Sequence, residues 1–417
     1  MYRWLYTLLL AIASPLLLFK LYKHKPNAPT FGQRWKEHFG ITPKLSTDSQ
    51  PVWFHTVSVG ETIAATPLIK AFIAQNPATP VLVTTTTATG REQVEKLGDL
   101  VEHRYMPIDF PFAIKGFLKS IQPSQLIIME TELWPNLLHL TAKQSVPITV
   151  MNARLSQRSM HRYQKVSGIF SEISDNVSRI LCQTQQDLTH FESLGVSSKK
   201  LAVTGSLKFD ITISESIAAK ATELRQEFGL NRPVWIAAST HQGEDEQVLT
   251  AHNKLLKKLP NALLIIVPRH PERFDQVYKL CADRKFSVSR RTAGYLADSQ
   301  VYVADTMGEL LILIKSADIC FMGGSLIGDK VGGHNLLEPA ALGVPSLTGP
   351  SYFNFKQITE ELEQLSALNV INAEQLPEQL IELFSAPDEL KRRAELAKQY
   401  VAQHQGAVNR TLPYLEQ

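Results

Sequence analysis

Cysteine is scarce in this sequence. Its three cysteines, Cys182, Cys281 and Cys320, are scattered through 417 residues without a CxxC pair, and no histidines cluster at the spacing of metal ligands. These absences exclude a disulfide framework and a structural zinc site, and they are typical of a reducing compartment. Short internal repeats and low-complexity tracts are also missing. The 44% hydrophobic content is ordinary for a chain that buries sizeable cores.

A net positive charge is lacking outside the N-terminal segment. Residues 1–40 contain six Lys or Arg and one acid, Glu37, so they carry +5 against a net charge of +3 for the whole chain. The remaining residues sum to −2, whereas a nucleic-acid-binding protein would carry a basic stripe through its folded domain. We therefore expect no nucleic acid partner. A basic front end on a near-neutral body indicates that the N-terminus meets an anionic surface.

The chain also lacks an uncharged run of the roughly 20 residues that cross a bilayer core. The run from Trp4 to Phe19 is shorter, and Pro15 is expected to interrupt a single straight helix. No small-x-small site follows, which argues against a cleaved signal peptide. Two interpretations stay open, a short single span or a helix lying in the membrane interface, and a buried core helix is the alternative to both. The Lys-rich flank favours a cytoplasmic body.

From about residue 50, short runs of β-forming residues alternate with segments of helical spacing. This alternation is typical of βαβ units and of parallel sheets covered on both faces. The first series of predicted strands covers residues 51–59, 80–87, 125–130, 147–153, 179–184 and 201–206. The second covers residues 232–240, 262–270, 299–306, 317–325 and 344–350. We therefore predict an α/β fold of two facing, doubly wound, Rossmann-like domains.

The predicted boundaries follow from this rhythm. Residues 1–40 form the basic, membrane-associated segment, 41–210 the first domain and 211–230 a linker or helix. The second domain covers 231–386, and a helix over 387–417 packs back across the first domain. In doubly wound sheets the loops after the strands line the ligand crevice, and facing domains enclose a cleft between them.

The first strand-to-helix turn, HTVSVGET, lacks the several glycines that a dinucleotide-binding turn carries. It offers one glycine, Gly60, followed by a carboxylate, Glu61. Ser58 and Glu61 fit a capping box, so a structural cap is one interpretation. The other is catalytic, because the helix dipole keeps Glu61 ionised and an ionised carboxylate is what a general base requires. This turn is then expected to face an acceptor, and a nucleotide belongs to the second domain.

Other strand ends of the first domain also carry charged side chains. Glu130 and Glu132 follow a strand in METELWPN, and Lys208 follows one in TGSLKFD. Carboxylates at a dry strand end are costly unless they are paired or used, and a lysine there is a candidate cation for developing negative charge. Asn152 and Arg154 in NARLS are further candidates. Structural ion pairs are the alternative for each of them.

The second domain carries glycines at its strand ends. Gly323-Gly324-Ser325 ends one strand, and Gly332-Gly333 precedes a helix that contains Asn335 and Glu338. Glycines that lead into a helix leave free N–H groups for an anion, and the carboxylate of Glu338 can accept two ribose hydroxyls. A glycine loop with a capping acid is the alternative. The pattern predicts a phosphate-bearing ligand.

Two further segments support a nucleotide site in this domain. Arg269 leaves a strand end in VPRHPERF, where a guanidinium can clamp a phosphate, although a solvated arginine is the more common outcome. Thr306 and Glu309 in DTMGEL fit a capping box, so a simple helix start is an equal alternative there.

Seven stretches in this order resemble the Kdo (3-deoxy-D-manno-octulosonic acid) transferases of lipopolysaccharide and lipid A synthesis. They are HTVSVGET, METELWPN, NARLS, TGSLKFD, VPRHPERF, DTMGEL and GGHNLLEPAA. The resemblance implies a GT-B glycosyltransferase with CMP-Kdo as donor and lipid IVA as acceptor. It also implies an inverting transfer without metal or cofactor, at the cytoplasmic face of the inner membrane of a Gram-negative bacterium.

The resemblance assigns roles to residues of this sequence. Glu61 matches the general base, and Glu130 and Lys208 match residues that stabilise the transition state. The positions that match the CMP-Kdo-binding loops are Pro268, Arg269, Met307, Gly308, Glu309, Asn335, Leu336, Leu337 and Glu338. The first domain then binds the acceptor and the second the nucleotide sugar. Two alternatives remain, a sugar-nucleotide epimerase of similar fold and a non-catalytic, membrane-tethered nucleotide-sugar binding module.

Overall fold

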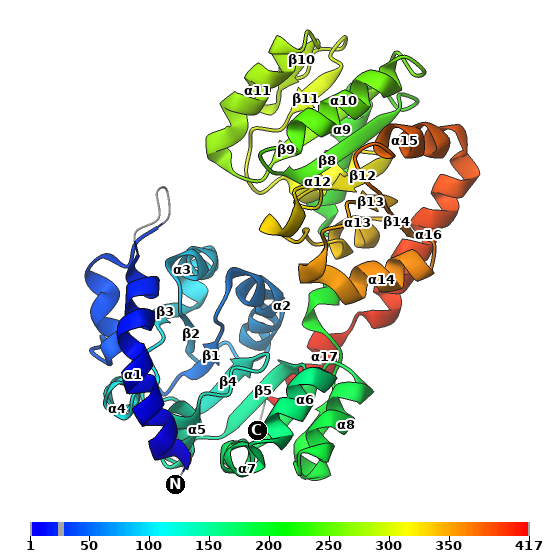
Figure 1. Cartoon of the computed structure of the whole chain (residues 1–417). Helices are drawn as coiled ribbons and strands as arrows, with labels where there is room; N and C mark the ends of the chain where they lie inside the picture. The colour runs from blue at the N-terminus through cyan, green and yellow to red at the C-terminus, as the bar shows by residue number, and fades with distance from the viewer. Residues whose placement is uncertain (1, 24–28, 416–417) are drawn as a thin grey trace. The chain divides into compact units, whose positions relative to one another are not determined.

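The structure is a computed structural model, and it describes residues 2–23 and 29–415. The chain divides into two compact units. Unit 1 comprises Met1–Asp210 with Gln405–Gln417, and unit 2 comprises Ile211–His404. Each unit is built around one parallel sheet, and each is described by itself (Figure 1).

The described residues of unit 1 form a seven-stranded parallel sheet in the order β3-β2-β1-β4-β5-β6-β7. Its strands are β1 (Val52–His55), β2 (Val81–Thr85), β3 (Glu102–Tyr105), β4 (Gln125–Met129), β5 (Ile148–Ala153), β6 (Arg179–Cys182) and β7 (Leu201–Val203). The order reverses between β1 and β4. Loops at the carboxyl ends of these two strands therefore diverge and leave room for a ligand.

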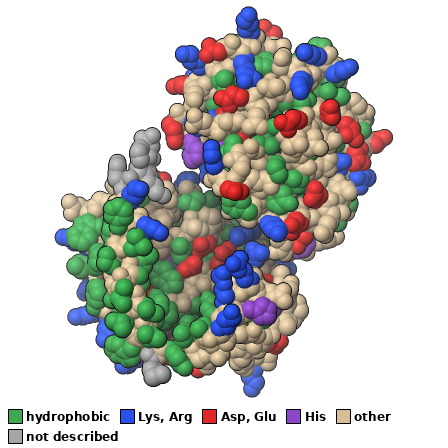
Figure 2. Space-filling view, in the orientation of Figure 1, with side chains coloured by type: hydrophobic (Ala, Val, Ile, Leu, Met, Phe, Trp, Pro, Cys, Tyr) green, Lys and Arg blue, Asp and Glu red, His purple; other side chains and the backbone are tan. Residues whose placement is uncertain are grey.

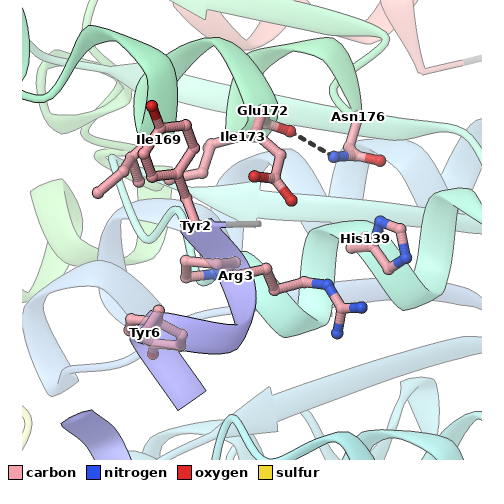
Figure 3. Close-up of a pocket in the computed structure, with 9 residues that line it drawn as sticks. Tyr2, Arg3, Tyr6, His139, Ile169, Glu172, Ile173 and Asn176 are labelled. Atoms are coloured by element: carbon pink, nitrogen blue, oxygen red, sulfur yellow. Dashed lines mark hydrogen bonds between the residues drawn. The ribbon is translucent and has the colours of Figure 1, made fainter. Parts of the chain in front are cut away.

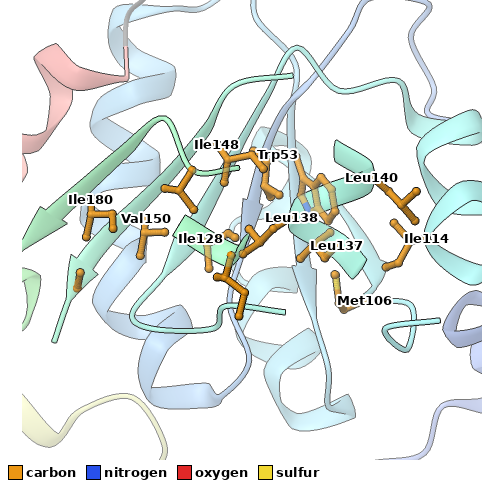
Figure 4. Close-up of a cluster of buried hydrophobic side chains, with 14 of the residues drawn as sticks. Trp53, Met106, Ile114, Ile128, Leu137, Leu138, Leu140, Ile148, Val150 and Ile180 are labelled. Atoms are coloured by element: carbon orange, nitrogen blue, oxygen red, sulfur yellow. The ribbon is translucent and has the colours of Figure 1, made fainter. Parts of the chain in front are cut away.

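Helices cover both faces of this sheet, because its central strands are apolar on both sides. Trp53, Ile128 and Val150 pack on one face, together with Leu137 and Leu138 of α5 (Figure 4). The residues between them in the strands pack on the other face. The helices of the unit are α1 (Tyr2–Tyr22), η1 (Gly32–Phe39), α2 (Val59–Gln75), α3 (Ala88–Glu95), η2 (Gly98–Leu100), α4 (Pro111–Ile121), α5 (Pro135–Ala142), α6 (Gln157–Gln164), α7 (Ser167–Asp175), α8 (Gln185–Ser193), η3 (Ser198–Lys200), η4 (Leu207–Phe209), α17 (Ala407–Thr411) and η9 (Leu412–Tyr414).

Unit 2 repeats this plan with the strand order β10-β11-β9-β8-β12-β13-β14, again parallel throughout. Its strands are β8 (Val234–Thr240), β9 (Leu263–Pro268), β10 (Val288–Arg290), β11 (Val301–Val303), β12 (Ile319–Met322), β13 (Ser346–Thr348) and β14 (Leu368–Val370). Its helices are α9 (Glu215–Phe228), α10 (Asp245–Leu256), η5 (Pro271–Arg273), α11 (Phe274–Asp283), η6 (Arg291–Ala293), α12 (Leu310–Lys315), η7 (Gly328–Lys330), α13 (Leu337–Leu342), η8 (Phe353–Phe355), α14 (Lys356–Gln364), α15 (Leu376–Ser385) and α16 (Pro387–His404).

Every predicted strand contains a strand of the structure, and the predicted fold class is confirmed. Three strands were not predicted, β3, β10 and β14, and each of them lies at an edge of its sheet. Their sequences, EHRY, VSR and LNV, are short, and each contains a polar residue that interrupts any apolar run. An edge strand pairs on one side only and is less buried, so it does not need the apolar run that reveals a central strand.

The expectation that Pro15 interrupts the N-terminal helix is wrong. α1 continues from Tyr2 to Tyr22 with Pro15 inside it. A proline removes the N–H that would bond to the carbonyl four residues earlier, here that of Ala11. The hydroxyl of Ser14 donates to this carbonyl at 2.8 Å and replaces the lost bond. Among the described residues α1 is the one helix that is long and apolar enough to cross a membrane.

The predicted C-terminal helix over 387–417 is broken at Gly406, which has a φ of 93°. α16 belongs to unit 2, and the chain returns to unit 1 only from Gln405. Asp210 holds this return, because its carboxylate accepts the backbone N–H groups of Gly406 at 2.6 Å and Val408 at 2.5 Å. One side chain thus fixes the start of α17, 196 residues away in sequence.

Replacing Asp210 by Ala leaves both N–H groups without their acceptor and is expected to lower the stability of unit 1 by about 2 kcal/mol. Urea or thermal unfolding of the purified variant measures this loss. Asp175→Ala is the control, because Asp175 is exposed. Equal unfolding midpoints for both variants would show that the C-terminal return does not depend on Asp210.

Candidate active site

Glu61 lies at the carboxyl edge of the first sheet, in the first turn of α2. Ser58 is the N-cap residue, and its hydroxyl accepts the N–H of Glu61 at 3.2 Å. The Glu61 carboxylate accepts the N–H of Val57 at 2.8 Å and the Ser58 hydroxyl at 2.9 Å. Burial raises the pKa of Glu61 above its usual value, although these hydrogen bonds oppose the shift. Glu61 is therefore both a cap and a carboxylate of increased basicity.

Glu130 and Lys208, which are 78 residues apart in sequence, meet at the same edge. Glu130 follows β4, the neighbour of β1 in the sheet, and Lys208 lies in η4 after β7. The Lys208 ammonium is 2.9 Å from a carboxylate oxygen of Glu130, and both side chains are partly exposed. Glu130 has a φ of +58°, a left-handed conformation that is uncommon outside glycine and often marks functional sites.

The negative charges of Glu130 and Glu132 both contribute to the raised pKa of Glu61. Three carboxylates and one lysine thus share this edge of the sheet. Glu132 accepts the indole N–H of Trp134 at 2.8 Å, which fixes its orientation. An acid made more basic by burial and by neighbouring carboxylates is suited to taking a proton from a hydroxyl group.

Asn152 has a supporting position behind these residues. It is buried, has a φ of +54°, and its side-chain oxygen accepts the N–H of Leu207 at 3.0 Å. Leu207 precedes Lys208, so this bond sets the start of the turn that carries the lysine. Arg154 is exposed, and its carbonyl accepts the hydroxyl of Thr131 at 2.7 Å.

In unit 2, Arg269 is exposed directly after β9, and its backbone N–H donates to Thr240 of β8 at 3.0 Å. Pro268, the last residue of β9, is buried. The imidazoles of His241 and His334 stack nearly parallel with their Nε2 atoms 2.9 Å apart. Burial lowers the pKa of His334 to about 3, with the charge of Arg269 acting in the same direction, and burial also lowers the pKa of His241.

The predicted segment Asn335–Glu338 begins helix α13. The side-chain oxygen of Asn335 accepts the N–H of Leu337 at 3.1 Å, and its amide is 3.3 Å from a carboxylate oxygen of Glu338. Leu336 and Leu337 are buried. Burial raises the pKa of Glu338, and the charge of Arg269 acts in the opposite direction. Arg269 and Glu338 therefore lie within electrostatic reach of each other.

In the loop after β12, which contains Gly323-Gly324-Ser325, the backbone N–H groups are bonded within the protein and are not available to a ligand. The buried carboxylate of Glu244 accepts the N–H groups of Gly324, Ser325 and Leu326 at 2.7–2.9 Å, and that of His241 at 2.9 Å. Gly323 is required by packing, because a Cβ there would lie 2.9 Å from the carbonyl of Ser239. This loop is held by the protein itself.

The second glycine pair is also used in packing. A Cβ on Gly332 would lie 2.4 Å from the ring of Phe353, and the N–H of Gly333 donates to the carbonyl of Gly324 at 2.8 Å. Both glycines have φ near +80°. Because they lack side chains and adopt this left-handed conformation, the segment between β12 and α13 can pack closely against Phe353 and Gly324.

Glu309 is not part of a capping box. Helix α12 begins after it, at Leu310. The guanidinium of Arg291 donates two hydrogen bonds of 2.9 and 3.0 Å to the Glu309 carboxylate. The hydroxyl of Thr306 donates to the same carboxylate at 2.5 Å. These bonds, that of Arg291 first, lower the pKa of Glu309. Met307 and Gly308, the latter with a φ of +85°, form an exposed turn before it.

Two features of the site were missed from the sequence. Glu244 and His241 lie in ASTHQGE, directly after β8, where strand-end position alone was the available signal. The left-handed residues Glu130, Asn152 and Ser239 all lie at the ends of strands, but their conformation has no sequence signature. Within residues 2–23 and 29–415, no group of three or more His, Cys, Asp or Glu has the arrangement of a metal site.

Known proteins with similar sequences include Kdo transferases. A family model described as 3-deoxy-D-manno-octulosonic-acid transferase (kdotransferase) matches residues 33–211. The chain is 39% identical to the 3-deoxy-D-manno-octulosonic acid transferase of Haemophilus influenzae over 426 residues, which cover 100% of this chain and 99% of the relative. It is 33% identical to the Bordetella pertussis transferase of the same name over 434 residues, with 99% of each chain covered.

Solved structures share the fold at low identity. A putative UDP-N-acetylglucosamine 2-epimerase from Listeria monocytogenes is 15% identical, with a TM-score of 0.54 over 89% of this chain and 96% of that chain. The glycotransferase of kitacinnamycin is 13% identical, with a TM-score of 0.55 over 89% of this chain and 99% of that chain. These likenesses show the GT-B type of fold, which epimerases and glycosyltransferases share.

The stability of unit 2 is expected to depend on the carboxylate of Glu244, which holds the loop after β12. Glu244→Gln keeps the size of the side chain but turns an amide donor toward N–H donors. The free energy of unfolding is expected to fall by about 3 kcal/mol, because buried N–H groups of the loop lose their acceptor. Thermal unfolding measures it, with Glu246→Gln as control, since Glu246 is exposed in the same helix. A wild-type melting temperature for Glu244→Gln would contradict this role.

Proposed function

Because this chain belongs to the family of 3-deoxy-D-manno-octulosonic acid (Kdo) transferases and is thus a glycosyltransferase, we propose that it transfers Kdo from CMP-Kdo to lipid IVA. The proposed transfer inverts the anomeric carbon and uses no metal or cofactor. We place it on the cytoplasmic face of a Gram-negative inner membrane. The observation that carries the proposal is the position of Glu61, a carboxylate of raised pKa beside the Glu130–Lys208 ion pair.

In the proposed mechanism Glu61 accepts the proton of an acceptor sugar hydroxyl. The oxygen forms a bond to the anomeric carbon of Kdo while the bond from that carbon to the phosphate oxygen of CMP breaks, and CMP leaves with the bonding electrons. Lys208 and Glu130 stabilise the transition state. A lysine held at 2.9 Å by Glu130 is positioned before the reaction, so no reorganisation is needed when charge develops.

We assign donor binding to unit 2. Arg269 is exposed at a strand end and suited to a phosphate, and the partly buried Glu338 is suited to the ribose hydroxyls. Pro268, Met307-Gly308-Glu309 and Asn335-Leu336-Leu337 shape the surrounding loops. Since Glu309 is already paired with Arg291, its proposed contribution is to hold the Met307–Gly308 turn in place.

Replacing Glu61 by Gln removes the base while keeping the shape of the side chain. Transfer of Kdo from CMP-Kdo to lipid IVA by detergent-solubilised protein is expected to fall by about 100-fold or more, with CMP binding retained. Mass spectrometry of the lipid measures the product. Glu92→Gln is the matched control, because it is the same substitution at an exposed residue of α3. Normal transfer by Glu61→Gln would mean that Glu61 is only a cap, and CMP binding without transfer by the wild type would favour a binding module.

The raised pKa of Glu61 predicts a pH dependence. A base acts when deprotonated, so transfer should decline as the pH falls through this pKa, which lies above the ordinary value of 4.5. Glu132→Gln removes a negative charge that raises the pKa, so the acidic limb of the rate profile should move to lower pH. Glu92→Gln, an exposed residue of α3, is the control. An acidic limb unmoved by Glu132→Gln would contradict Glu61 as the titrating base.

A further inference from the structure

Helix α1 is attached to unit 1 at its N-terminal end. The guanidinium of Arg3 donates to the side-chain oxygen of Asn136 in α5 at 3.0 Å, and the amide of Asn136 donates to the hydroxyl of Thr7 at 3.0 Å. The hydroxyl of Tyr6 bonds to the carboxylate of Asp109. Figure 3 shows the first turn of α1 lying against α5 and α7.

The other end of the helix is attached to the same unit. The Tyr22 hydroxyl lies 2.6 Å from Nδ1 of His38 in η1. The ring of Tyr22 also meets that of Phe31 edge to face, with centroids 5.5 Å apart. The η1 segment is itself fixed to the sheet, because the buried Glu37 accepts the N–H of Tyr105 in β3.

Between these ends, one face of α1 follows unit 1 and the other is open. The partly buried residues recur at the spacing of one helical face, and they are Arg3, Tyr6, Thr7, Leu10, Ser14, Leu18 and Leu21. The opposite face carries large apolar residues that are 53–72% exposed, and they are Trp4, Leu5, Leu8, Leu9, Ile12, Leu16 and Phe19. Figure 2 shows this apolar band over α1.

The length of α1 does not distinguish a helix that spans a membrane from one that lies in the membrane interface. Its 21 residues make a helix about 31 Å long, close to the thickness of a bilayer core. A spanning helix would place its two ends on opposite sides of the membrane. Here both ends contact unit 1, and crossing would either break these contacts or draw Asp109 and Asn136 into the hydrocarbon.

We propose that α1 does not cross the bilayer but lies in its interface, with the Trp4–Phe19 face in the lipid and both ends on the side of unit 1. The partner is an anionic lipid surface. Residues 1–36 contain no Asp or Glu, and Lys20, Lys23 and Lys36 are exposed around the far end of the helix. The proposal rests on the proposed function only for the identity of the membrane.

This attachment connects the membrane to the catalytic edge. Asn136, which holds Arg3 and Thr7, lies in the first turn of α5, and the loop before α5 carries Glu130 and Glu132. The backbone N–H groups of Asn136 and Leu137 also bond to Asp109, at 3.0 and 2.7 Å. A helix fixed flat on the lipid surface thereby sets the height and orientation of the acidic loop above that surface.

Depth measurements on the full chain test the proposal. Single cysteines at Trp4, Ile12 and Phe19 are labelled with an environment-sensitive fluorophore. The protein is bound to vesicles of phosphatidylethanolamine and phosphatidylglycerol that contain spin-labelled lipids. An interfacial helix places the three labels at one shallow depth, and quenching should be equal. If Ile12 is quenched most strongly by labels at the bilayer centre, and Trp4 and Phe19 by labels near the headgroups, α1 spans the membrane and the proposal is overturned.

A second measurement separates this proposal from the proposed function. Ile12→Asp should reduce vesicle binding roughly tenfold or more, since a large apolar side chain leaves the lipid. Its transfer to detergent-dispersed acceptor should stay near the wild-type level. Leu230→Asp, at an exposed site of unit 2, is the matched control. Unchanged vesicle binding by Ile12→Asp overturns the lipid-facing assignment, whereas absent transfer by the wild type overturns the proposed function and leaves the depth result valid.

Discussion

Loops that follow buried strands need acceptors for their own N–H groups, and in this protein carboxylates supply many of them. Asp109 accepts two N–H groups at the start of α5, and Asp210 accepts two at the start of α17. Glu244 accepts four, one in the loop after β8 and three in the loop after β12. A buried N–H without an acceptor costs about 1–3 kcal/mol, so each of these side chains decides a loop conformation. Both sheets present their loops in fixed positions because of these bonds.

The acids at the strand ends differ in their surroundings. Glu244 is buried and its oxygens are filled by backbone donors, and Glu309 is occupied by Arg291 and Thr306. Glu61 differs, because it is partly exposed and its pKa is raised by burial and by neighbouring carboxylates. Glu61 thus combines a raised pKa with a partly exposed position at the edge of the sheet, whereas Glu244 and Glu309 hold their loops in place. All three acids lie near strand ends and accept hydrogen bonds from the protein, and only their burial and charged neighbours distinguish them.

The N-terminal helix belongs to this framework and is not an appendage. Ser14 replaces the hydrogen bond that Pro15 removes, so α1 stays continuous across the face of unit 1. Asn136 contacts α1 through its side chain and Asp109 through its backbone. The apolar N-terminal helix, the start of α5 and the acidic loop before it are thus parts of one connected set of contacts.

The sequence by itself determined the central strands, the α/β class and the family, because buried parallel strands are continuous apolar runs and charged motifs follow them in a specific order. It also named Glu61, Glu130 and Lys208, although it did not show that Glu130 and Lys208 form a pair. The short edge strands β3, β10 and β14 were missed, since an edge needs little apolar burial. Only the tertiary structure decided that Glu244 occupies the glycine loop 80 residues away, and that both ends of α1 rest on one unit. These outcomes depend on which distant segment supplies a partner, and local sequence does not specify that.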